Sequence, residues 1–480
     1  MNSEAHLRRA KIVCTLGISS NTYAKIKALA ESGMDVARLN FSHGTYEEHR
    51  ELIHMVRRVS EDIGKPIAIL QDLPGPKIRV QTFKKGAVEL KEGDMFTVTT
   101  RTVTGNENIV SVSYKGFSGD VTPGETVLLD DGNLKLTVEE IEGPDVHCRV
   151  VYGGILKDHK GLNLPGSVLS VDALTEKDKE YLRFGIEHNV DYVAVSFVQK
   201  SGDIIMAKKE IESAGRDIPV IAKIEKPQAV DCIDEITDYA DVIMIARGDL
   251  GVEMFTEEIP PIQKKIIKLC NEKGVPVITA TQMLESMIHQ ARPTRAEAAD
   301  VANAVLDGTD AVMLSAETAA GAFPVESVKM MSRIVSLIES ETEMQYQLLR
   351  RKQDWIYPAQ VAIGYSACHA AQMTGSAAII CLTQSGSTAR MISRFRPDHT
   401  ILAVTPREDT YHRLSLVWGV STHKVEHEFP DNMDDALHHI FIMLKDRGFI
   451  RTGDKVVITA GIPFQKMRGS NMLRIEEVVV

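Results

Sequence analysis

Cysteine and long apolar runs are scarce in this sequence of 480 residues. None of the six cysteines belongs to a CxxC pair or to a Cys/His group with zinc spacing, so we expect buried, reduced thiols: Cys14, Cys148, Cys232, Cys270, Cys368 and Cys381. No apolar run has membrane length, and the N-terminal segment MNSEAHLRRAKIV lacks the apolar core of a signal peptide. A cytoplasmic protein with no membrane partner is therefore expected.

Positive charge is also in short supply. The chain has 55 Lys and Arg against 66 Asp and Glu, a formal net charge of -11, which argues against general binding to nucleic acid or to an anionic membrane. With 44% hydrophobic and 25% charged residues, the composition is that of a globular protein. At this length a single hydrophobic core is not expected, so the chain should contain several domains.

Apolar runs rich in Val and Ile alternate with amphipathic helical stretches over much of the chain, which is typical of βαβ units and a parallel sheet. There are eight such runs: 11–16 (KIVCTL), 36–41 (VARLNF), 66–72 (PIAILQD), 192–197 (YVAVSF), 219–225 (PVIAKIE), 241–247 (DVIMIAR), 276–282 (PVITATQ) and 310–317 (DAVMLSAE). They predict an α/β fold with a closed (β/α)8 TIM barrel, whose active residues lie at the carboxyl ends of the strands.

Two further domains are predicted around this barrel. Between the third and fourth runs, residues 73–168 alternate β-rich pieces with Gly, Asp and Pro turns, which indicates an inserted small β-barrel lid. After a helical stretch that leads toward residue 350, the runs AAIICLT, ILAVTP and KVVITAG predict an open α/β domain. The expected boundaries are 1–72 and 169–345 for the catalytic barrel, 73–168 for the lid and 346–480 for a C-terminal regulatory domain.

Polar residues follow the barrel runs, where barrel geometry gathers them at one mouth. They are Arg38, Asn40, Ser42 and His43; Asp72, Lys77 and Arg79; Lys223 and Glu225; Arg247, Gly248 and Asp249; Thr281 and Gln282; and Ser315, Glu317 and Thr318. Cations suited to phosphate, acids able to hold a divalent metal and hydroxyls at one point are what phosphoryl transfer needs. Lys223 and Glu225 are two residues apart on one strand and so share a face.

Each of these residues also has a purely structural interpretation. Lys223 with Glu225 is a possible buried ion pair, Asp249 a helix cap, Arg38 a salt bridge at the barrel rim and His43 a turn residue. Taken singly, these interpretations are about as good as the functional ones. Taken together they are weak, because independent caps and ion pairs are not expected to gather at one end of one barrel.

Eight segments in order through the chain closely resemble the pyruvate kinase family. They are VARLNFSHG (36–44), DLPGPKIR (72–79), KGLNLPG (160–166), AKIEKP (222–227), ARGDLGVE (246–253), TATQMLESM (279–287), RPTRAE (292–297) and DAVMLSAETA (310–319). The resemblance continues more weakly into the C-terminal domain and so covers nearly the whole chain. It implies a homotetrameric glycolytic enzyme that makes pyruvate and ATP from phosphoenolpyruvate and ADP.

The resemblance also implies a role for each matching position. Arg38 and Lys223 contact the transferring phosphoryl group, while Glu225 and Asp249 ligate Mg²⁺ or Mn²⁺. The Gly248 backbone and Thr281 hold the substrate carboxylate, and the Thr281 hydroxyl lies where the enolate is protonated. The positions that meet the nucleotide are Asn40, Phe41, Ser42, His43, Arg79 and Lys160. Ser315 and Glu317 lie in a segment near the proton path.

One position departs from the pattern of the animal enzymes. Lys77, in GPKIR, stands where potassium-dependent members carry a glutamate, which resembles a bacterial subgroup that looks independent of K⁺. In such members the lysine ammonium takes the space of the monovalent cation, with Asn40, Ser42, Asp72 and Leu73 as its neighbours. The competing interpretation is a surface lysine at the lid hinge.

The segment LTQSGSTAR predicts a phosphate-binding loop between a strand and a helix. Its residues, Thr383, Gln384, Ser385, Gly386, Ser387 and Thr388, match the loop that holds a phosphorylated activator in regulated members of the family. The final segment lacks the tryptophan and arginine pattern linked to fructose 1,6-bisphosphate, so a sugar monophosphate or a nucleotide monophosphate is at least as good a candidate as that bisphosphate, with Lys466 and Arg468 as possible contacts. An ordinary Ser/Thr helix cap is the competing interpretation.

Two other functions remain open at this point. A barrel aldolase or phosphoenolpyruvate mutase would also use Mg²⁺ and an enolate, but it would not need a lid over a nucleotide. A metabolite-sensing scaffold that kept only the barrel would be expected to lose Lys223, Glu225 or Asp249, and all three are present.

Overall fold

The structure is a computed structural model that describes residues 8–167, 169–341, 358–430, 432–463 and 469–480. The chain divides into two compact units. The first comprises Met1–Gln71, His188–Tyr192 and Ile267–Val480, and the second comprises Asp72–Glu187 and Val193–Ile266. Within the described part of the chain, no helix has the length and apolar character needed to cross a membrane.

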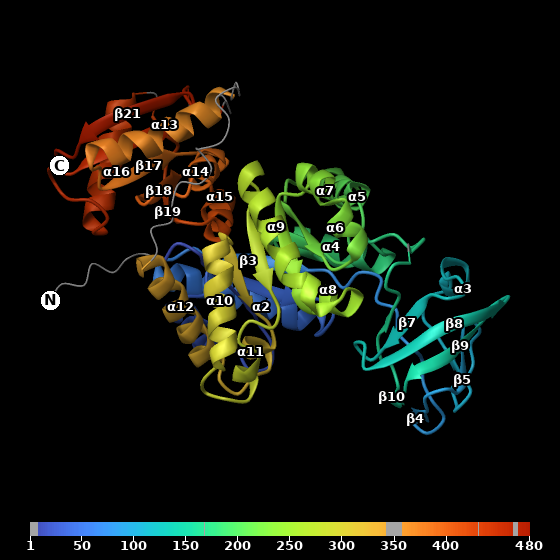
Figure 1. Ribbon diagram of the computed structural model, residues 1–480. Helices are drawn as coiled ribbons and strands as arrows, with labels where there is room; N and C mark the ends of the chain where they lie inside the picture. Colours follow the sequence, from blue (N-terminus) through green and yellow to red (C-terminus); the bar gives the residue numbers. More distant parts are fainter. Residues whose placement is uncertain (1–7, 168, 342–357, 431, 464–468) are drawn as a thin grey trace. The chain divides into compact units, whose positions relative to one another are not determined.

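A closed barrel of eight strands confirms the main fold prediction (Figure 1). Its order is β1-β16-β15-β14-β13-β12-β3-β2, and each strand lies inside one of the eight apolar runs. The strands are β1 (Lys11–Thr15), β2 (Val36–Asn40), β3 (Ala68–Asp72), β12 (Tyr192–Val195), β13 (Val220–Ile224), β14 (Val242–Ala246), β15 (Val277–Ala280) and β16 (Ala311–Leu314). Nearly all their residues are buried, as expected for strands covered on both faces.

The helices begin and end where the sequence provides caps. In α2, Thr45 and Glu48 form a reciprocal capping box, and Gly64 ends the helix in the left-handed conformation. In the first unit, α1 packs on both α2 and α12. Helix α12 also packs on α10, and the two lie side by side in Figure 1. The barrel helices are α1 (Tyr23–Ser32), α2 (Tyr46–Ile63), α4 (Glu176–Glu187), α5 (Ser201–Ser213), α6 (Pro227–Asp231), α7 (Ile233–Tyr239), α8 (Arg247–Glu253), α9 (Ile259–Lys273), α10 (Arg295–Asp307), α11 (Ala316–Ala319) and α12 (Pro324–Glu341).

The inserted segment is a small β structure with its own core. Its six-stranded sheet has the order β11-β7-β8-β9-β5-β6, and a second sheet pairs β10 with β4. The chain at Arg79 and Val80 joins the two edges of the larger sheet, because Arg79 bridges to Gly161 beside β11 and Val80 bridges to Val112 beside β6. The elements are β4 (Ala87–Leu90), β5 (Met95–Thr99), β6 (Ile109–Ser111), α3 (Phe117–Asp120), β7 (Thr126–Leu129), β8 (Leu134–Glu142), β9 (Asp145–Tyr152), β10 (Gly154–Lys157) and β11 (Leu162–Asn163).

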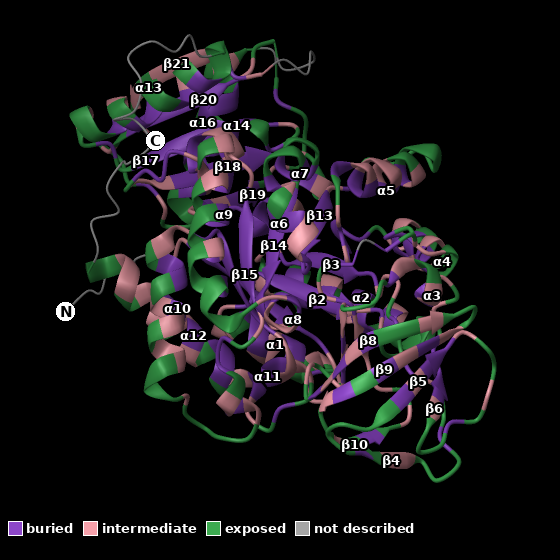
Figure 2. Cartoon of the chain, turned by 45° about the vertical axis from the view of Figure 1, so that its right-hand side comes forward, coloured by how far each residue is buried: buried purple, intermediate pink, exposed green. Residues whose placement is uncertain are grey.

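Burial distinguishes this segment from the barrel strands. In β8 and β9, buried residues alternate with half-buried or exposed ones over much of the strand, whereas barrel strands such as β13 are buried throughout (Figure 2). A sheet with one face on a small core and one face in water shows this alternation. We call residues 73–168 the lid from here on; its boundaries, like those of the other two domains, stay a prediction.

The C-terminal part is an open α/β sheet, as predicted, with the order β19-β18-β17-β20-β21. Alternate residues of β17 face opposite sides: Ile380 packs with Leu437 of α16, and Ile379 packs with Ala367 of α13. The sequence analysis did not predict β19 or the antiparallel edge strand β21. The elements are α13 (Ala359–Thr374), β17 (Ala378–Leu382), α14 (Ser387–Ser393), β18 (Thr400–Thr405), α15 (Glu408–Arg413), β19 (Val420–Lys424), α16 (Met433–Asp446), β20 (Lys455–Ala460) and β21 (Met472–Glu477).

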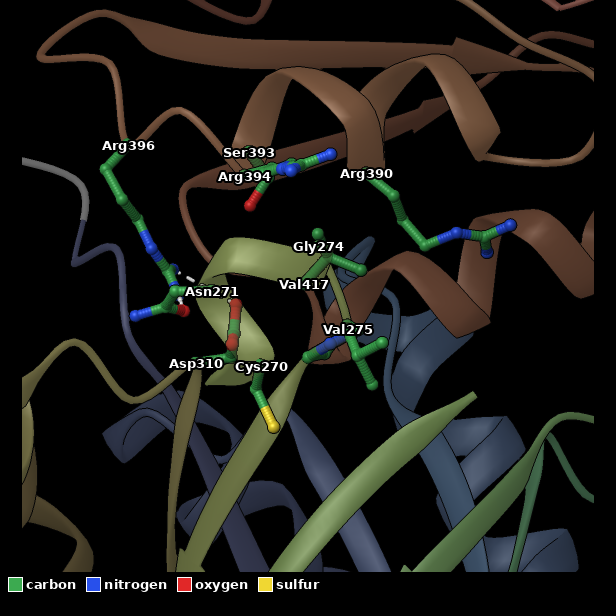
Figure 3. A pocket seen from close by; sticks show the side chains of 11 residues that line it. Cys270, Asn271, Gly274, Val275, Asp310, Arg390, Ser393, Arg394, Arg396 and Val417 are labelled. Atoms are coloured by element: carbon green, nitrogen blue, oxygen red, sulfur yellow. Dashed lines mark hydrogen bonds and ion pairs between the residues drawn. The ribbon is translucent and has the colours of Figure 1, made fainter. Parts of the chain in front are cut away.

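Within the first unit, the C-terminal sheet docks at the amino-terminal ends of barrel strands. Lys11, the first residue of β1, donates its Nζ to the carbonyl of Val420, 2.8 Å away. Arg396 reaches Asp310, just before β16, at 3.0 Å and stacks over the Trp418 ring. Figure 3 shows Arg396 and Asp310 in a small pocket lined by both parts. This end of the barrel is opposite to the ends that carry the predicted site residues.

Candidate active site

Strand β13 places Lys223 and Glu225 in contact. The ammonium of Lys223 lies 2.8 Å from Oε1 of Glu225, and both side chains are at least nine-tenths buried. The spacing of two residues puts both on the barrel interior, as the sequence predicts. The structural interpretation, a buried ion pair, therefore describes their geometry correctly. A buried pair of this kind is weak evidence for stability, which directs attention to what else surrounds it.

Two more oxygens complete the surroundings of the Lys223 ammonium. Asp72 Oδ1, at the end of β3, lies 3.2 Å from Nζ, and Ser196 Oγ, just after β12, accepts a hydrogen bond of 2.7 Å from it. Ser196 in turn donates to the carbonyl of Leu73 at 2.8 Å, which fixes its orientation. The ends of three neighbouring barrel strands thus hold one cation in place.

The Glu225 carboxylate is under electrostatic strain. Burial raises its pKa above the ordinary value, the nearby Lys223 charge opposes that rise, and the negative charge of Asp249 adds to it. Its Oε2 accepts a hydrogen bond of 2.8 Å from the backbone N–H of Phe197. Two neighbouring acids, one of them buried, make a site where an added cation would be favoured.

Helix α8 brings Asp249 to this carboxylate. The helix follows β14 directly, with Ala246 as its N-cap residue, so Asp249 lies in the first turn and is not the cap. Gly248 is half-buried and Asp249 is exposed, whereas Arg247 is buried and contacts Gln263 at 3.3 Å. No group of three or more His, Cys, Asp or Glu residues suited to a metal occurs among the described residues. Two carboxylates that leave positions for substrate oxygens fit Mg²⁺ or Mn²⁺.

Lys77 lies in the field of these groups. As a residue it is exposed, yet its pKa is lowered, first by desolvation and then by the like charge of Lys223, while Asp72, Asp249 and Glu225 raise it. The charges of Lys223, Asp72, Asp249 and Glu225 all act on this ammonium. Leu73, beside Asp72, is buried.

Five predicted site residues of the first unit lie on β2 or in the loop that follows it. Arg38 in β2 is buried and donates to Thr15 Oγ1 at 2.8 Å. At the end of β2, the Asn40 side chain accepts a hydrogen bond of 3.1 Å from the N–H of Ser42. Phe41 is buried and stacks on His49 of α2 at 4.0 Å, and His49 Nε2 contacts the carbonyl of the exposed His43 at 2.9 Å. These contacts shape the loop in which four predicted nucleotide residues lie.

Thr281 follows β15 in an unusual backbone conformation. Its φ is 68° and that of Gln282 is 55°, a region that such residues seldom adopt and that often marks functional sites. The Thr281 hydroxyl donates to the carbonyl of Ala280 at 2.6 Å. Glu317, with its pKa raised by burial, accepts the N–H groups of Leu284 and Ser315 and so closes the loop.

The two predicted nucleotide residues of the lid lie next to each other. The bridge between Arg79 and Gly161 brings them together, and Arg79 Nη1 donates to the carbonyl of His159 at 2.9 Å. Lys160 Nζ pairs with Asp130 Oδ1 at 2.7 Å. A basic pair is therefore presented at this edge of the lid.

The predicted effector loop joins β17 to α14. Its buried Thr383 accepts the N–H of Gly386 at 2.9 Å, and Thr388 contacts Ser470 at 2.8 Å. The N-cap of α14 is Gly386, with no side-chain cap, so the hydroxyls of Ser385 and Ser387 do not serve as an ordinary cap; they lie 3.2 Å from each other. Gln384 Nε2 donates to Glu428 at 2.7 Å. Lys466 and Arg468 lie outside the described residues.

Sequence reasoning missed several residues around this site. Ser196 stands in the run YVAVSF, and a hydroxyl at the end of a barrel strand was the available signal. Lys226 pairs with Glu253 at 2.9 Å, and Asn163 of the lid donates to the same Glu253 oxygen at 2.9 Å. Lys226, Glu253 and Asn163 lie inside the motifs AKIEKP, ARGDLGVE and KGLNLPG, respectively. Which of them contact one another depends on the tertiary structure, so the sequence does not reveal it.

Comparison with known families decides the identity of this arrangement. The family model described as "Pyruvate kinase, barrel domain" matches residues 7–328, and "Pyruvate kinase, alpha/beta domain" matches residues 361–476. The chain belongs to the pyruvate kinase family. Its members are phosphotransferases, and this membership sets aside the aldolase, the mutase and the scaffold that the sequence left open.

Curated relatives and a solved structure agree with the family. The chain is 46% identical to pyruvate kinase 2 of Synechocystis sp. over 98% of its length and 79% of the relative's. It is 42% identical to the pyruvate kinase of Clostridium perfringens over 98% of this chain and the whole of that protein. A crystal structure of a pyruvate kinase from Cryptosporidium parvum superposes with a TM-score of 0.93 at 36% identity, covering 98% of this chain and 96% of that one.

Proposed function

We propose that this pyruvate kinase family member transfers the phosphoryl group of phosphoenolpyruvate to ADP, giving pyruvate and ATP in glycolysis, with Mg²⁺ or Mn²⁺ as its cofactor. The observation that carries the proposal is the cluster of Lys223, Glu225, Asp72 and Asp249 at the strand ends. A buried lysine held by oxygens from three strands suits a charge that develops during phosphoryl transfer.

The role of Lys223 follows from its surroundings. Its ammonium faces the phosphoryl group during transfer and neutralises the negative charge that spreads over the phosphoryl oxygens. Glu225 and Asp249 hold the divalent cation, which supplies Lewis acidity toward the substrate oxygens when it is bound. The burial that raises the pKa of Glu225 also makes a bound cation more favourable there.

The remaining site residues are assigned by the resemblance. Arg38 binds the phosphoryl group from β2, and the Gly248 N–H and Thr281 bind the substrate carboxylate. The unusual φ of Thr281 supports a role for its hydroxyl in the protonation of the enolate. Asn40, Phe41, Ser42, His43, Arg79 and Lys160 bind the nucleotide. Residues 1–72 and 169–345 supply the catalytic barrel, and residues 73–168 cover the nucleotide.

A direct assay tests the proposed reaction. Pyruvate release from phosphoenolpyruvate is measured with and without ADP and with and without Mg²⁺. The proposal requires that pyruvate release depend on both ADP and Mg²⁺. Release without ADP, or release unchanged after removal of divalent metal, would contradict it.

The Lys77 ammonium supports independence from K⁺. The charges of Asp72, Glu225 and Asp249 act on it, and an added monovalent cation in the same field would meet its positive charge. We infer that Lys77 replaces that cation among Asn40, Ser42, Asp72 and Leu73. Equal activity in potassium and tetraalkylammonium salts is the expected result.

Loop 383–388 supports activation by a phosphorylated metabolite, with a sugar phosphate or a nucleotide monophosphate as the candidates. Gly386 at the start of α14 and the hydroxyls of Ser385 and Ser387 are suited to a phosphate. Titration of phosphoenolpyruvate against a panel of such phosphates identifies the effector. We further propose a cytoplasmic homotetramer with residues 346–480 as its regulatory domain.

A further inference from the structure

A second buried ion pair lies beside the phosphoryl site. Lys226, which follows Glu225, places its Nζ 2.9 Å from Oε1 of Glu253, with 3% and 2% of the two side chains exposed. Taking two charges out of water is costly, and an apolar pair of the same volume would often be as stable. The pair is therefore poorly explained as a device for stability alone.

A lid residue completes this pair. Asn163 Nδ2 donates to the same Oε1 of Glu253 at 2.9 Å. Asn163 is the last residue of β11, the edge strand of the lid sheet, and stands three residues after Lys160. One carboxylate oxygen thus connects the lid, the loop after β13 and the end of α8.

Helix α8 carries this connection to the metal side of the site. Glu253 is its last residue and Asp249 lies four residues earlier, about one helical turn away. Among the described residues, Glu253 Oε2 is buried without a hydrogen-bond partner. The contacts of this carboxylate with Lys226 and Asn163 both fall on Oε1, which makes the connection depend on one oxygen.

We propose that Glu253 and Asn163 are positioning residues that tie the lid strand next to Lys160 to the helix that carries Asp249. The connection keeps the nucleotide-binding edge of the lid in register with the metal carboxylate. This inference rests on the proposed function. Neither residue contacts substrate in this proposal. The buried ion pair is retained, despite its desolvation cost, because it aligns the binding sites of the two substrates.

The test replaces Asn163 with leucine, which has nearly the same volume but donates no hydrogen bond and leaves Lys226 and Glu253 paired. We expect the KM for ADP to rise about tenfold, with the KM for phosphoenolpyruvate changed less than twofold. In the protein without ligands, hydrogen exchange at the amides of β11 and β7 should become faster. The matched control is Asn108→Leu, an exposed residue before β6 at the far edge of the lid sheet, where neither quantity should change.

A second variant separates the hydrogen bond from side-chain packing. The exchanged pair Asn163→Asp with Glu253→Gln again places an amide donor against a carboxylate and keeps the net charge of the group of Asn163, Lys226 and Glu253 unchanged. We expect this double variant to keep the KM for ADP within about threefold of wild type. A tenfold rise equal to that of Asn163→Leu would overturn the proposal, as would an Asn163→Leu protein with unchanged KM and unchanged exchange.

Failure of the proposed function would look different. In that case the wild-type protein would not release pyruvate in response to ADP, while the exchange comparison would still report on the connection. A role in stability alone would speed exchange throughout the lid, including β8 and β9, and would raise both KM values together.

Discussion

The barrel and the C-terminal sheet are both parallel α/β structures, but they end their strands differently. The barrel buries charged side chains there, with Asp72, Lys223 and Glu225 all at most 8% exposed. The C-terminal sheet buries neutral hydroxyls: Thr383 after β17 and Thr405 at the end of β18 each accept a backbone N–H. Two sheets with similar strands therefore carry very different electrostatics at their carboxyl ends.

The difference in buried charge indicates that the two sheets have different functions. A buried charge costs far more than a buried hydroxyl that has a local hydrogen-bond partner, so charges remain only where something needs them. Charge development in a transition state is such a need, whereas binding a ligand without changing it is not. We therefore expect substitutions at the barrel mouth to change the reaction, and substitutions in the C-terminal sheet to change stability or regulation.

The largest effect is expected for Lys223→Met. The side chain keeps its length but loses the charge that three strand ends hold in place, so transition-state stabilisation should be lost while the fold remains. We expect kcat to fall by about 10³-fold or more, measured as pyruvate release at saturating phosphoenolpyruvate and ADP.

A surface lysine provides the control for this variant. Lys208→Met, on α5, removes a partly exposed ion pair with Asp241 and should keep kcat within about twofold of wild type. Circular dichroism should show the same secondary structure in both variants. Near-normal turnover by the Lys223 variant would show that the charge at the barrel mouth is not needed for the reaction. The functional contrast between the two sheets would then be wrong.

A smaller effect, on stability, is expected from His423 in β19. Burial, and then the neighbouring Arg447, lower its pKa from 6.5 to about 3. The unfolded chain binds a proton below pH 6.5 and the folded chain does not until about pH 3, so this stability is full above pH 6.5 and is lost as pH falls toward 3. Between pH 7 and 5 the loss should be about 2 kcal/mol, seen in chemical denaturation.

The variant His423→Gln should lack most of this pH dependence. It keeps a polar side chain that can contact Arg447 and Ser421 but cannot take up the proton. His439→Gln, on the exposed face of α16, should behave as wild type. Equal slopes of stability against pH in wild type and His423→Gln would show that the C-terminal sheet does not store an acid-sensitive group at this position.

The same contrast explains which strands could be predicted. The barrel strands and β17, β18 and β20 are continuous apolar runs, because both faces of each sheet are covered. In β19, with the sequence VSTHK, the buried His423 contacts Arg447, a partner from a distant segment that no local pattern reveals. Strand β21 is a half-exposed edge strand and lacks the continuous run.

The charged residues of the site could be predicted from the sequence, whereas its backbone conformation and its tertiary contacts could not. Lys223 and Glu225 stand out because charges at the end of a buried strand need an explanation. The positive φ of Thr281 is imposed by its surroundings, and the bond between Asn163 and Glu253 joins residues ninety positions apart. Neither leaves a trace in composition or spacing, so only coordinates reveal them.

A tenfold effect is expected from Lys77→Glu, which replaces a positive charge by a negative one in the field of Asp72 and Asp249. The added negative charge should demand a monovalent cation from solution. Activity of the variant in a tetraalkylammonium salt should fall about tenfold below its activity in potassium, while wild type differs less than twofold. Lys84→Glu, an exposed lid residue, is the matched control. A variant indifferent to the salt would assign Lys77 to the lid surface instead.

The smallest effect belongs to the neutral loop of the C-terminal sheet. Ser385→Asp places a carboxylate where a phosphate is proposed to bind, so like charges should exclude the effector without touching the barrel. We expect the activator to lower the phosphoenolpyruvate concentration for half-maximal rate several-fold in wild type and not in the variant, with equal rates in its absence. Ser421→Asp, at the half-buried second position of β19, controls for an added charge elsewhere in the same sheet. If Ser385→Asp instead lowered the rate without effector, the C-terminal sheet would take part in the reaction itself, and the division between a charged sheet for chemistry and a neutral sheet for regulation would fail.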